Sequence, residues 1–466
     1  MLSFLPSFLS LPPPSRPRLW LVLCGVCGAL HGPAQAQTAQ PAPVGLTAPV
    51  PGLPQPQSPV ELLRWLTRQH PLIQAKKADA DAARQAVEIA RRQHWPTPSL
   101  GSDYGPKSAG HSNPLQSITI ARVSVPLFTG GLLSAEDELA AMRLRSAELD
   151  VRVQAQDLGM QLLDLYRNWW QHTHRLETLQ QSLARMQDLQ DMMQRRNEAG
   201  ISAPLDLQLT QVQLRRLQDE QLQSERLRDQ ALGEMVQLLG RPVQPAKWRF
   251  ADLGRPPWPE LGGLTERVLQ VNPAMQLGEQ QIEITRVDQK RTRASLLPTV
   301  SLRYEHQWGS YYGSTLPGER LYINTQTAWG AGLSALQQQQ QALARTESAQ
   351  QQLEATRQRV QSLCNRLWHE ERLADSQLRN ALTLANDYSD LIDAGLRLFT
   401  AGRRSWQDLM TLQREQHQVQ MQRADAEAAL LGARLRTLWL ADALPDVRLS
   451  ELTPLSLPTE PALPTP

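Results

Sequence analysis

The side chains that could do chemistry in this sequence are few, and their spacing argues against catalysis. His172 and His174 stand two positions apart in a stretch that reads as helix. Residues at i and i+2 do not share a helix face, so this pair is not expected to hold a metal ion. The sequence contains no phosphate-binding loop, nucleophile elbow or zinc-ligand spacing, and Trp169 and Trp170 are predicted to pack. We therefore expect no enzyme activity, no cofactor and no metal site.

Two short polar stretches draw attention instead, because each begins with Ala-Gly after a helical segment. "AGISAPLDLQ" occupies residues 199–208, and "AGRRSWQDLM" occupies residues 401–410, at an offset of 202 residues. The glycine predicts a left-handed helix end, and Ser202 and Ser405 are predicted to cap the helices that follow. Asp408 stands three residues after Ser405, which is the spacing of a capping box. Each stretch therefore predicts a reversal between two helices.

The same offset of 202 residues relates much larger parts of the chain. Pro71 corresponds to Pro273, and the correspondence continues without gaps from residues 70–104 onto 272–306. It also carries Arg195 onto Arg397 and Asp206 onto Asp408. A fixed offset held over this length indicates an internal duplication.

Each copy contains the same predicted elements in the same order. A helix (about residues 72–95 and 274–296) ends before a proline, a pair of strands follows, and a very long helix (133–198 and 337–398) leads through the Ala-Gly reversal into a return helix (203–239 and 406–440). At 1.5 Å per residue, the long helices reach about 100 Å and must pack lengthwise. Apolar residues in the first long helix follow the 3-4 spacing of a coiled-coil seam that Gln190 interrupts: Leu176, Leu179, Leu183, Met186 and Met193.

The predicted strands alternate apolar and polar residues over 9 to 13 positions, for example in "VSLRYEHQW" at residues 300–308. Such a length is typical of transmembrane β-strands, with one face toward lipid. Weaker copies lie at 97–105 and 117–127, where the alternation slips near Arg122 and suggests a bulge. A soluble hairpin on a helical body is the alternative. The aromatic residues expected to form a girdle at the membrane interfaces are Tyr304, Trp308, Tyr311, Tyr312, Tyr322 and Trp329.

The N-terminus resembles a secretory signal: two arginines precede the apolar run "LWLVLCGVCGAL" and an "AQA" cleavage site at residues 34–36. The apolar run is too short to span a bilayer. Charge is balanced, with 48 basic and 46 acidic side chains, so no nucleic-acid partner is expected. The predicted boundaries are a signal peptide 1–36, a Pro-rich linker 37–57, a first repeat 58–240 with strands 97–105 and 117–127, a linker 241–260, a second repeat 261–441 with strands 299–309 and 321–334, and a Pro-rich tail 442–466.

Four strands cannot close a barrel, and an open sheet edge is unstable in lipid. If the strands do span a membrane, several copies of the chain must share one barrel. The sequence therefore predicts an α+β membrane protein that forms a homo-oligomer.

In these features the chain resembles the TolC family of bacterial outer-membrane efflux ducts. The resemblance covers residues 58–441 and is carried by 272–306, by "VSVPLFTGGLLSAEDELAAMRLRSAELD" at 123–150 and by the two reversals. It implies a homotrimer with a twelve-stranded β-barrel continuous with an α-helical periplasmic tunnel. It also implies a location in the outer membrane of a Gram-negative bacterium and two partners, a periplasmic adaptor protein and an inner-membrane pump driven by protons or ATP.

The resemblance also assigns roles to the reversals, as periplasmic tips of the tunnel. Asp408 matches a family aspartate at the closed constriction, Thr411 replaces a second one, and Arg404 and Asp206 are further gate candidates. The residues expected to contact the adaptor are Ala199, Gly200, Ile201, Ser202, Ala401, Gly402 and Arg403. One departure is "LSALQQQQQAL" at 333–343, which lacks the Pro and Gly-Gly of "VPLFTGG" at 125–131. The expected function is a passive exit duct for efflux or type I secretion, and the alternatives are an exported coiled-coil scaffold and an outer-membrane enzyme.

Overall fold

The structure of the chain is a computed structural model that describes residues 57–106, 115–248, 258–309, 318–327, 334–444, 447–449 and 452. Residues 54–466 form one compact unit. The predicted signal peptide lies outside the described residues.

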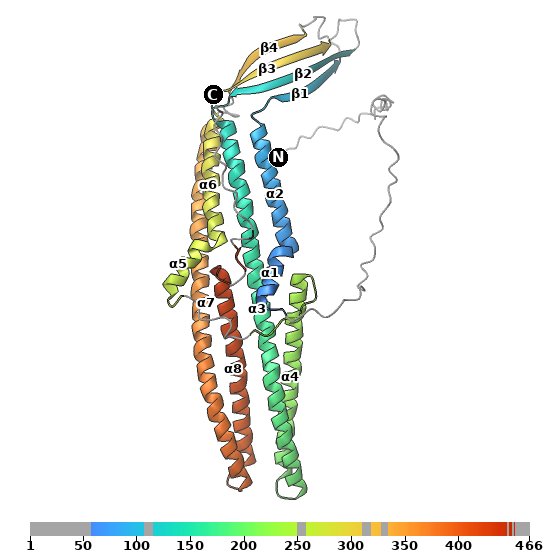
Figure 1. Cartoon of the computed structure of the whole chain (residues 1–466), viewed down its shortest axis with the longest axis vertical. Helices are drawn as coiled ribbons and strands as arrows, with labels where there is room; N and C mark the ends of the chain where they lie inside the picture. The colour runs from blue at the N-terminus through green and yellow to red at the C-terminus, as the bar shows by residue number, and fades with distance from the viewer. Residues whose placement is uncertain are drawn as a thin grey trace, which may run out of the picture. The chain divides into compact units, whose positions relative to one another are not determined.

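One series of two helices, two strands and two long helices occurs twice within this unit (Figure 1). The first series is α1 Pro59–Gln69, α2 Pro71–Arg92, β1 Thr97–Pro106, β2 Leu115–Phe128, α3 Leu132–Glu198 and α4 Pro204–Leu239. The second series is α5 Leu261–Val271, α6 Pro273–Ala294, β3 Thr299–Gly309, β4 Glu319–Gln326, α7 Ala335–Thr400 and α8 Trp406–Leu440. The starts of α1 and α5 are separated by the 202 residues of the sequence repeat, and so are those of α2 and α6.

The short helices α1 and α5 were not predicted from the sequence. A capping box starts α1, in which Ser58 and Glu61 exchange bonds between side chains and backbone N–H groups. A proline at the first position of α2 and of α6 separates the helices, because proline starts a helix well and cannot continue one. The side chains of His70 and Asn272 cap these second helices.

The four long helices lie side by side in the order α7, α8, α3, α4 (Figure 1). The apolar seam predicted on α3 is buried, from Leu176 and Leu179 to Met193. It packs on α4 within its own hairpin and on the end of α8 nearest the reversal. The α3–α4 hairpin and the α7–α8 hairpin are therefore joined along the contact between α3 and α8.

A second buried cluster joins α1, the middle of α3, α4 and the end of α8. Trp439 is fully buried there, and its indole N–H donates to the carbonyl of Gln156 at 3.0 Å. The predicted Pro-rich tail contributes to the same cluster, because Leu444, Val447 and Leu449 are buried. The packed part of the second repeat therefore continues past residue 441 into this apolar segment, which the high proline content of the tail did not indicate.

The four strands form one antiparallel sheet in the order β1-β2-β3-β4. Arg122 keeps regular register with both neighbours, so the bulge suggested there is corrected: the register shifts between Pro126 and Phe128 instead. β4 pairs with β3 as far as Gln326, opposite Thr299, and residues 328–333 of the predicted strand 321–334 lie outside the described residues. Pairing stops there because Pro298 precedes Thr299 and has no N–H to donate.

The turns from strand to long helix differ between the two series. In the first, Gly130 and Gly131 both adopt positive φ, at 61° and 83°, which explains the glycine pair of "VPLFTGG". In the second, residues 328–333 lie outside the described part of the chain, and α7 follows Ser334 without a side-chain cap. The Gln run at 337–341 belongs to the first turns of α7.

Candidate functional site

The sheet has two chemically different faces, because paired residues project to the same side. Leu302 pairs with Ile323, and Tyr304 pairs with both Leu321 and Val123. Several of the large apolar side chains on this face are exposed: Leu321 is 68% exposed and Ile323 65%. An apolar face of this extent, which the described residues leave uncovered, indicates contact with another apolar phase or partner.

The opposite face carries charged and polar side chains. Arg122 forms an ion pair with Glu305 across β2 and β3, and the Tyr322 hydroxyl donates to the Glu305 carboxylate at 2.7 Å. Tyr322 therefore departs from the predicted aromatic girdle, since it lies on the polar face. Tyr304 and Trp308 lie on the apolar face and are exposed. Tyr311, Tyr312 and Trp329 lie outside the described residues.

The two reversals at the far ends of the long helices have the same backbone geometry. Gly200 and Gly402 adopt φ of 71° and 72°, which L-residues with a side chain rarely do. The N–H of Ile201 donates to the carbonyl of Arg196, and the N–H of Arg403 donates to that of Leu398. These bonds span five residues and are typical of the Schellman motif that ends helices at glycine.

The two return helices start differently, although the sequence predicted a serine cap for both. Ser405 caps α8, and its hydroxyl accepts from the backbone N–H of Asp408 at 3.1 Å. Ala203 is the N-cap of α4 and makes no side-chain bond. Ser202 instead accepts a bond from Arg196, so its predicted capping role is corrected. The difference lies in one position of the sequence, because Ser202 stands one residue before the N-cap of α4, whereas Ser405 is the N-cap of α8.

A contact between the two tips was missed by the sequence analysis. The Trp406 indole is buried, and its N–H donates to the hydroxyl of Thr210 in α4 at 3.0 Å. Phe399 lies against Trp406, with ring centroids 4.9 Å apart, and the Arg196 guanidinium lies over the Phe399 ring. The sequence did contain a signal for this contact: aromatic residues flank Gly402, whereas none flanks Gly200 at the matching position of the first repeat.

The gate candidates lie around these tips but form no ion pair with one another in the described part of the chain. Asp408 is exposed in the first turn of α8, and Asp206 is partly buried in the first turn of α4. The Arg404 side chain lies near Gly395 of α7, and Arg403 is exposed. Ala199, Gly200, Ile201, Ala401 and Gly402 are also exposed, and Ser202 is partly buried.

The two histidines His172 and His174 have different surroundings. His174 contacts Glu177 and Glu427, whereas burial lowers the pKa of His172. The described residues contain no group of three or more His, Cys, Asp or Glu side chains placed to hold a metal ion. Trp169 is buried in the core, and Trp170 stacks on His174.

Residues 62–241, the first repeat, match the family model of outer membrane efflux proteins. The resemblance predicted from the sequence is confirmed. No curated protein sequence matches the chain.

Solved structures extend the likeness to most of the chain. A membrane protein from Pseudomonas aeruginosa superposes with a TM-score of 0.70 at 17% identity, over 83% of this chain and 90% of its own. The outer membrane protein VceC from Vibrio cholerae gives 0.68 at 12% identity, over 82% and 95%. The CmeC outer membrane channel of Campylobacter jejuni gives 0.67 at 11% identity, over 82% and 85%. At these identities the likeness shows a shared fold.

The family match and these structures support the predicted location of the protein in the outer membrane. Among the described residues, no helix is both long and apolar enough to cross a membrane.

Proposed function

We propose that three copies of this chain form a passive exit duct in the outer membrane, which carries efflux or secretion substrates out of the periplasm. The two-faced sheet with open edges carries this proposal. β1 pairs only with β2, and β4 pairs only with β3, so two edges of the described sheet lack partners. Joining β4 of one copy to β1 of the next would satisfy both edges and close a barrel.

The long helices offer matching open faces. On α7, Leu384, Leu391 and Leu398 are exposed and recur every seven residues. On α4, at the other side of the four-helix layer, Leu205 and Val212 are exposed on one stripe. A seven-residue apolar repeat is typical of a coiled-coil seam. Packing α7 of one copy against α4 of the next would bury both stripes and continue the layer into a tube.

The tips provide the surface for partners in this proposal. They consist of exposed backbone and short side chains around Gly200 and Gly402, with the apolar Ile201 exposed beside them. A periplasmic adaptor would bind here and connect the duct to an inner-membrane pump. Asp408 of the three copies would face the axis at the narrowest point.

Two substitutions on adjacent residues of β4 test the membrane assignment. Ile323→Lys places a charge on the apolar face, where it costs about 2–4 kcal/mol near the middle of a bilayer. Asn324→Lys adds the same charge to the polar face and serves as the matched control. We expect Ile323→Lys to prevent insertion and trimer formation, measured by native mass spectrometry of detergent-extracted membranes. Equal trimer yields from both variants, or a folded monomer from the unsubstituted protein, would overturn the proposal.

A further inference from the structure

Polar contacts along the seam between α8 and the α3–α4 hairpin include two histidines in unusual surroundings. The His174 Nδ1 lies 3.2 Å from Glu177, and its Nε2 lies 2.8 Å from Glu427 of α8. Burial alone would raise the pKa of Glu427, but bonds from His174 and Arg423 lower it overall, so this carboxylate is ionised at neutral pH. An ionised carboxylate only accepts hydrogen bonds. Both nitrogens of His174 must therefore carry protons for both bonds to form.

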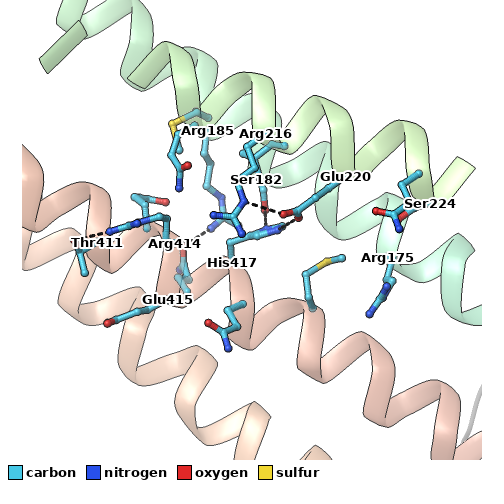
Figure 2. A pocket seen from close by; sticks show the side chains of 18 of the residues that line it. Arg175, Ser182, Arg185, Arg216, Glu220, Ser224, Thr411, Arg414, Glu415 and His417 are labelled. Atoms are coloured by element: carbon cyan, nitrogen blue, oxygen red, sulfur yellow. Dashed lines mark hydrogen bonds and ion pairs between the residues drawn. The ribbon is translucent and has the colours of Figure 1, made fainter. Parts of the chain in front are cut away.

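His417 of α8 makes a similar pair of contacts, and Figure 2 shows its ring directed at Ser182 and Glu220. Its Nε2 lies 2.9 Å from the Glu220 carboxylate of α4, and its Nδ1 lies 3.2 Å from the Ser182 hydroxyl of α3. Ser182 has one proton, which it donates to the carbonyl of Thr178 at 3.0 Å. Its oxygen can then only accept from His417, so this ring too makes all its bonds as an imidazolium.

The charged groups around each ring come from every element that packs there. Around His174 they are Glu177 of α3, which pairs with Lys247, and Glu427 of α8, which pairs with Arg423. Around His417, a cavity of about 690 Å³ is lined by α3, α4 and α8 (Figure 2). Its charged lining residues are Arg175, Arg185, Arg216, Glu220, Arg414 and Glu415.

Another bond on the seam does not depend on a histidine. Arg175 of α3 makes two bonds of 2.6 Å to the Asp425 carboxylate of α8, which lies along α8 between His417 and Glu427, the partner of His174. Arginine stays protonated at physiological pH, so this pair stays formed when a histidine loses its proton. Deprotonation would therefore loosen the seam without separating the hairpins completely.

We propose that His174 and His417 are protonation-dependent staples that hold the α7–α8 hairpin against the α3–α4 hairpin. With both rings protonated, His174 of α3 donates to Glu427 of α8, and His417 of α8 donates to Glu220 of α4, each by a charge-assisted bond between the hairpins. When a ring is neutral, one nitrogen has no proton to donate. A neutral His174 either loses the bond to Glu427 or keeps it without the charge and loses the bond to Glu177 inside α3. A neutral His417 either loses a bond to the other hairpin or receives the proton that Ser182 now gives to Thr178. Alkaline conditions thus favour separation of the hairpins, and acidic conditions oppose it. The inference concerns one chain and holds whether or not the chain acts as a duct.

The rate at which a buried thiol becomes accessible can measure this separation. Met186 lines the same cavity and is 5% exposed, so Met186→Cys in a Cys364→Ala background reports opening of the seam. The full-length mature protein would be labelled with a maleimide at pH 6 and pH 8, with His174 and His417 intact or both replaced by Gln. Glutamine keeps a donor and an acceptor but does not titrate. For each protein, the labelling rate at pH 8 is divided by the rate at pH 6. The thiol ionises more at pH 8 in both proteins, so comparing their two ratios removes that effect.

We expect the ratio for the protein with intact histidines to exceed that of the double Gln variant by roughly five- to tenfold, as the loss of one or two hydrogen bonds predicts. His94→Gln is the matched control, because His94 pairs with Asp137 away from this seam and should leave the ratio unchanged. If the double variant does not fold, His174→Gln and His417→Gln alone should each reduce the ratio. Equal ratios with and without the seam histidines would overturn the proposal.

Discussion

One glycine in the central core has no room for a methyl group, so its replacement by alanine tests how tightly α3 packs against α8. Gly159 lies in the interior of α3 against the indole of Trp439 in α8. A Cβ added to Gly159 would lie 2.5 Å from Nε1 and Cζ2 of that ring. Trp439 is 1% exposed, and its N–H is bonded to Gln156, so the ring is poorly placed to move aside.

The expected magnitude follows from two opposing effects. Overpacking a core costs typically 1–3 kcal/mol, and the severe overlap at Gly159 favours the upper end. Replacing glycine by alanine inside a helix stabilises the folded state by about 1 kcal/mol through helix propensity. Gly159→Ala should therefore destabilise the protein by about 2 kcal/mol. Gly233→Ala is the matched control, because Gly233 is also inside a helix and nothing lies within 4 Å of an added Cβ. It should stabilise by about 1 kcal/mol.

Chemical unfolding in mild detergent, followed by circular dichroism, measures both effects. Gly432→Ala adds an intermediate case, since its Cβ would meet the flexible stem of Arg167. Trp439→Phe removes the indole atoms that clash, so it should cost less in the Gly159→Ala background than alone. If Gly159→Ala and Gly233→Ala change the unfolding free energy with the same sign and size, the packing argument at Trp439 is wrong.

The remaining predictions concern the tips and the seam. In bilayer recordings, Asp408→Ala should abolish block by divalent cations added from the tip side and weaken cation preference, because a ring of carboxylates attracts cations; an unchanged block would leave Asp408 as a helix-start residue only. Gly200→Val and Gly402→Val should each strain a reversal by roughly 1–2 kcal/mol, and export should fail while trimers still form; normal export by the double variant would refute the tip assignment. Glu427→Gln should lower the free energy of unfolding at pH 7. Folding lowers the pKa of Glu427 from its ordinary value of 4.5, so its carboxylate stabilises the folded protein at pH values above 4.5. The difference between the variant and the unsubstituted protein should shrink as the pH falls through the folded-state pKa, which unfolding curves from pH 7 to pH 3 would show.

Local patterns in the sequence account for much of the fold. The 202-residue repeat is visible in the sequence itself. The proline that begins α2 and the glycines at the reversals can also be interpreted locally, because each restricts the backbone of its own neighbours. Alternation along β3 likewise separated an apolar face from a polar one. The same reasoning misplaced the bulge at Arg122, because the register of β2 is set by its pairing with β3 and not by its own pattern.

Tertiary structure alone decided how the two hairpins hold each other. Trp406 bonds Thr210 across 196 residues, and Trp439 bonds Gln156 across 283. The histidine bonds on the α8 seam are of the same kind. Each depends on the rotation of one long helix relative to another and on side-chain rotamers at the contact. Periodicity fixes which face of a helix is apolar, but it does not fix which residue of a distant helix meets that face. The sequence by itself therefore determined the duplication and most of the elements, but not the short helices α1 and α5. The packing of α8 against α3 and α4 determined the contacts that join the hairpins.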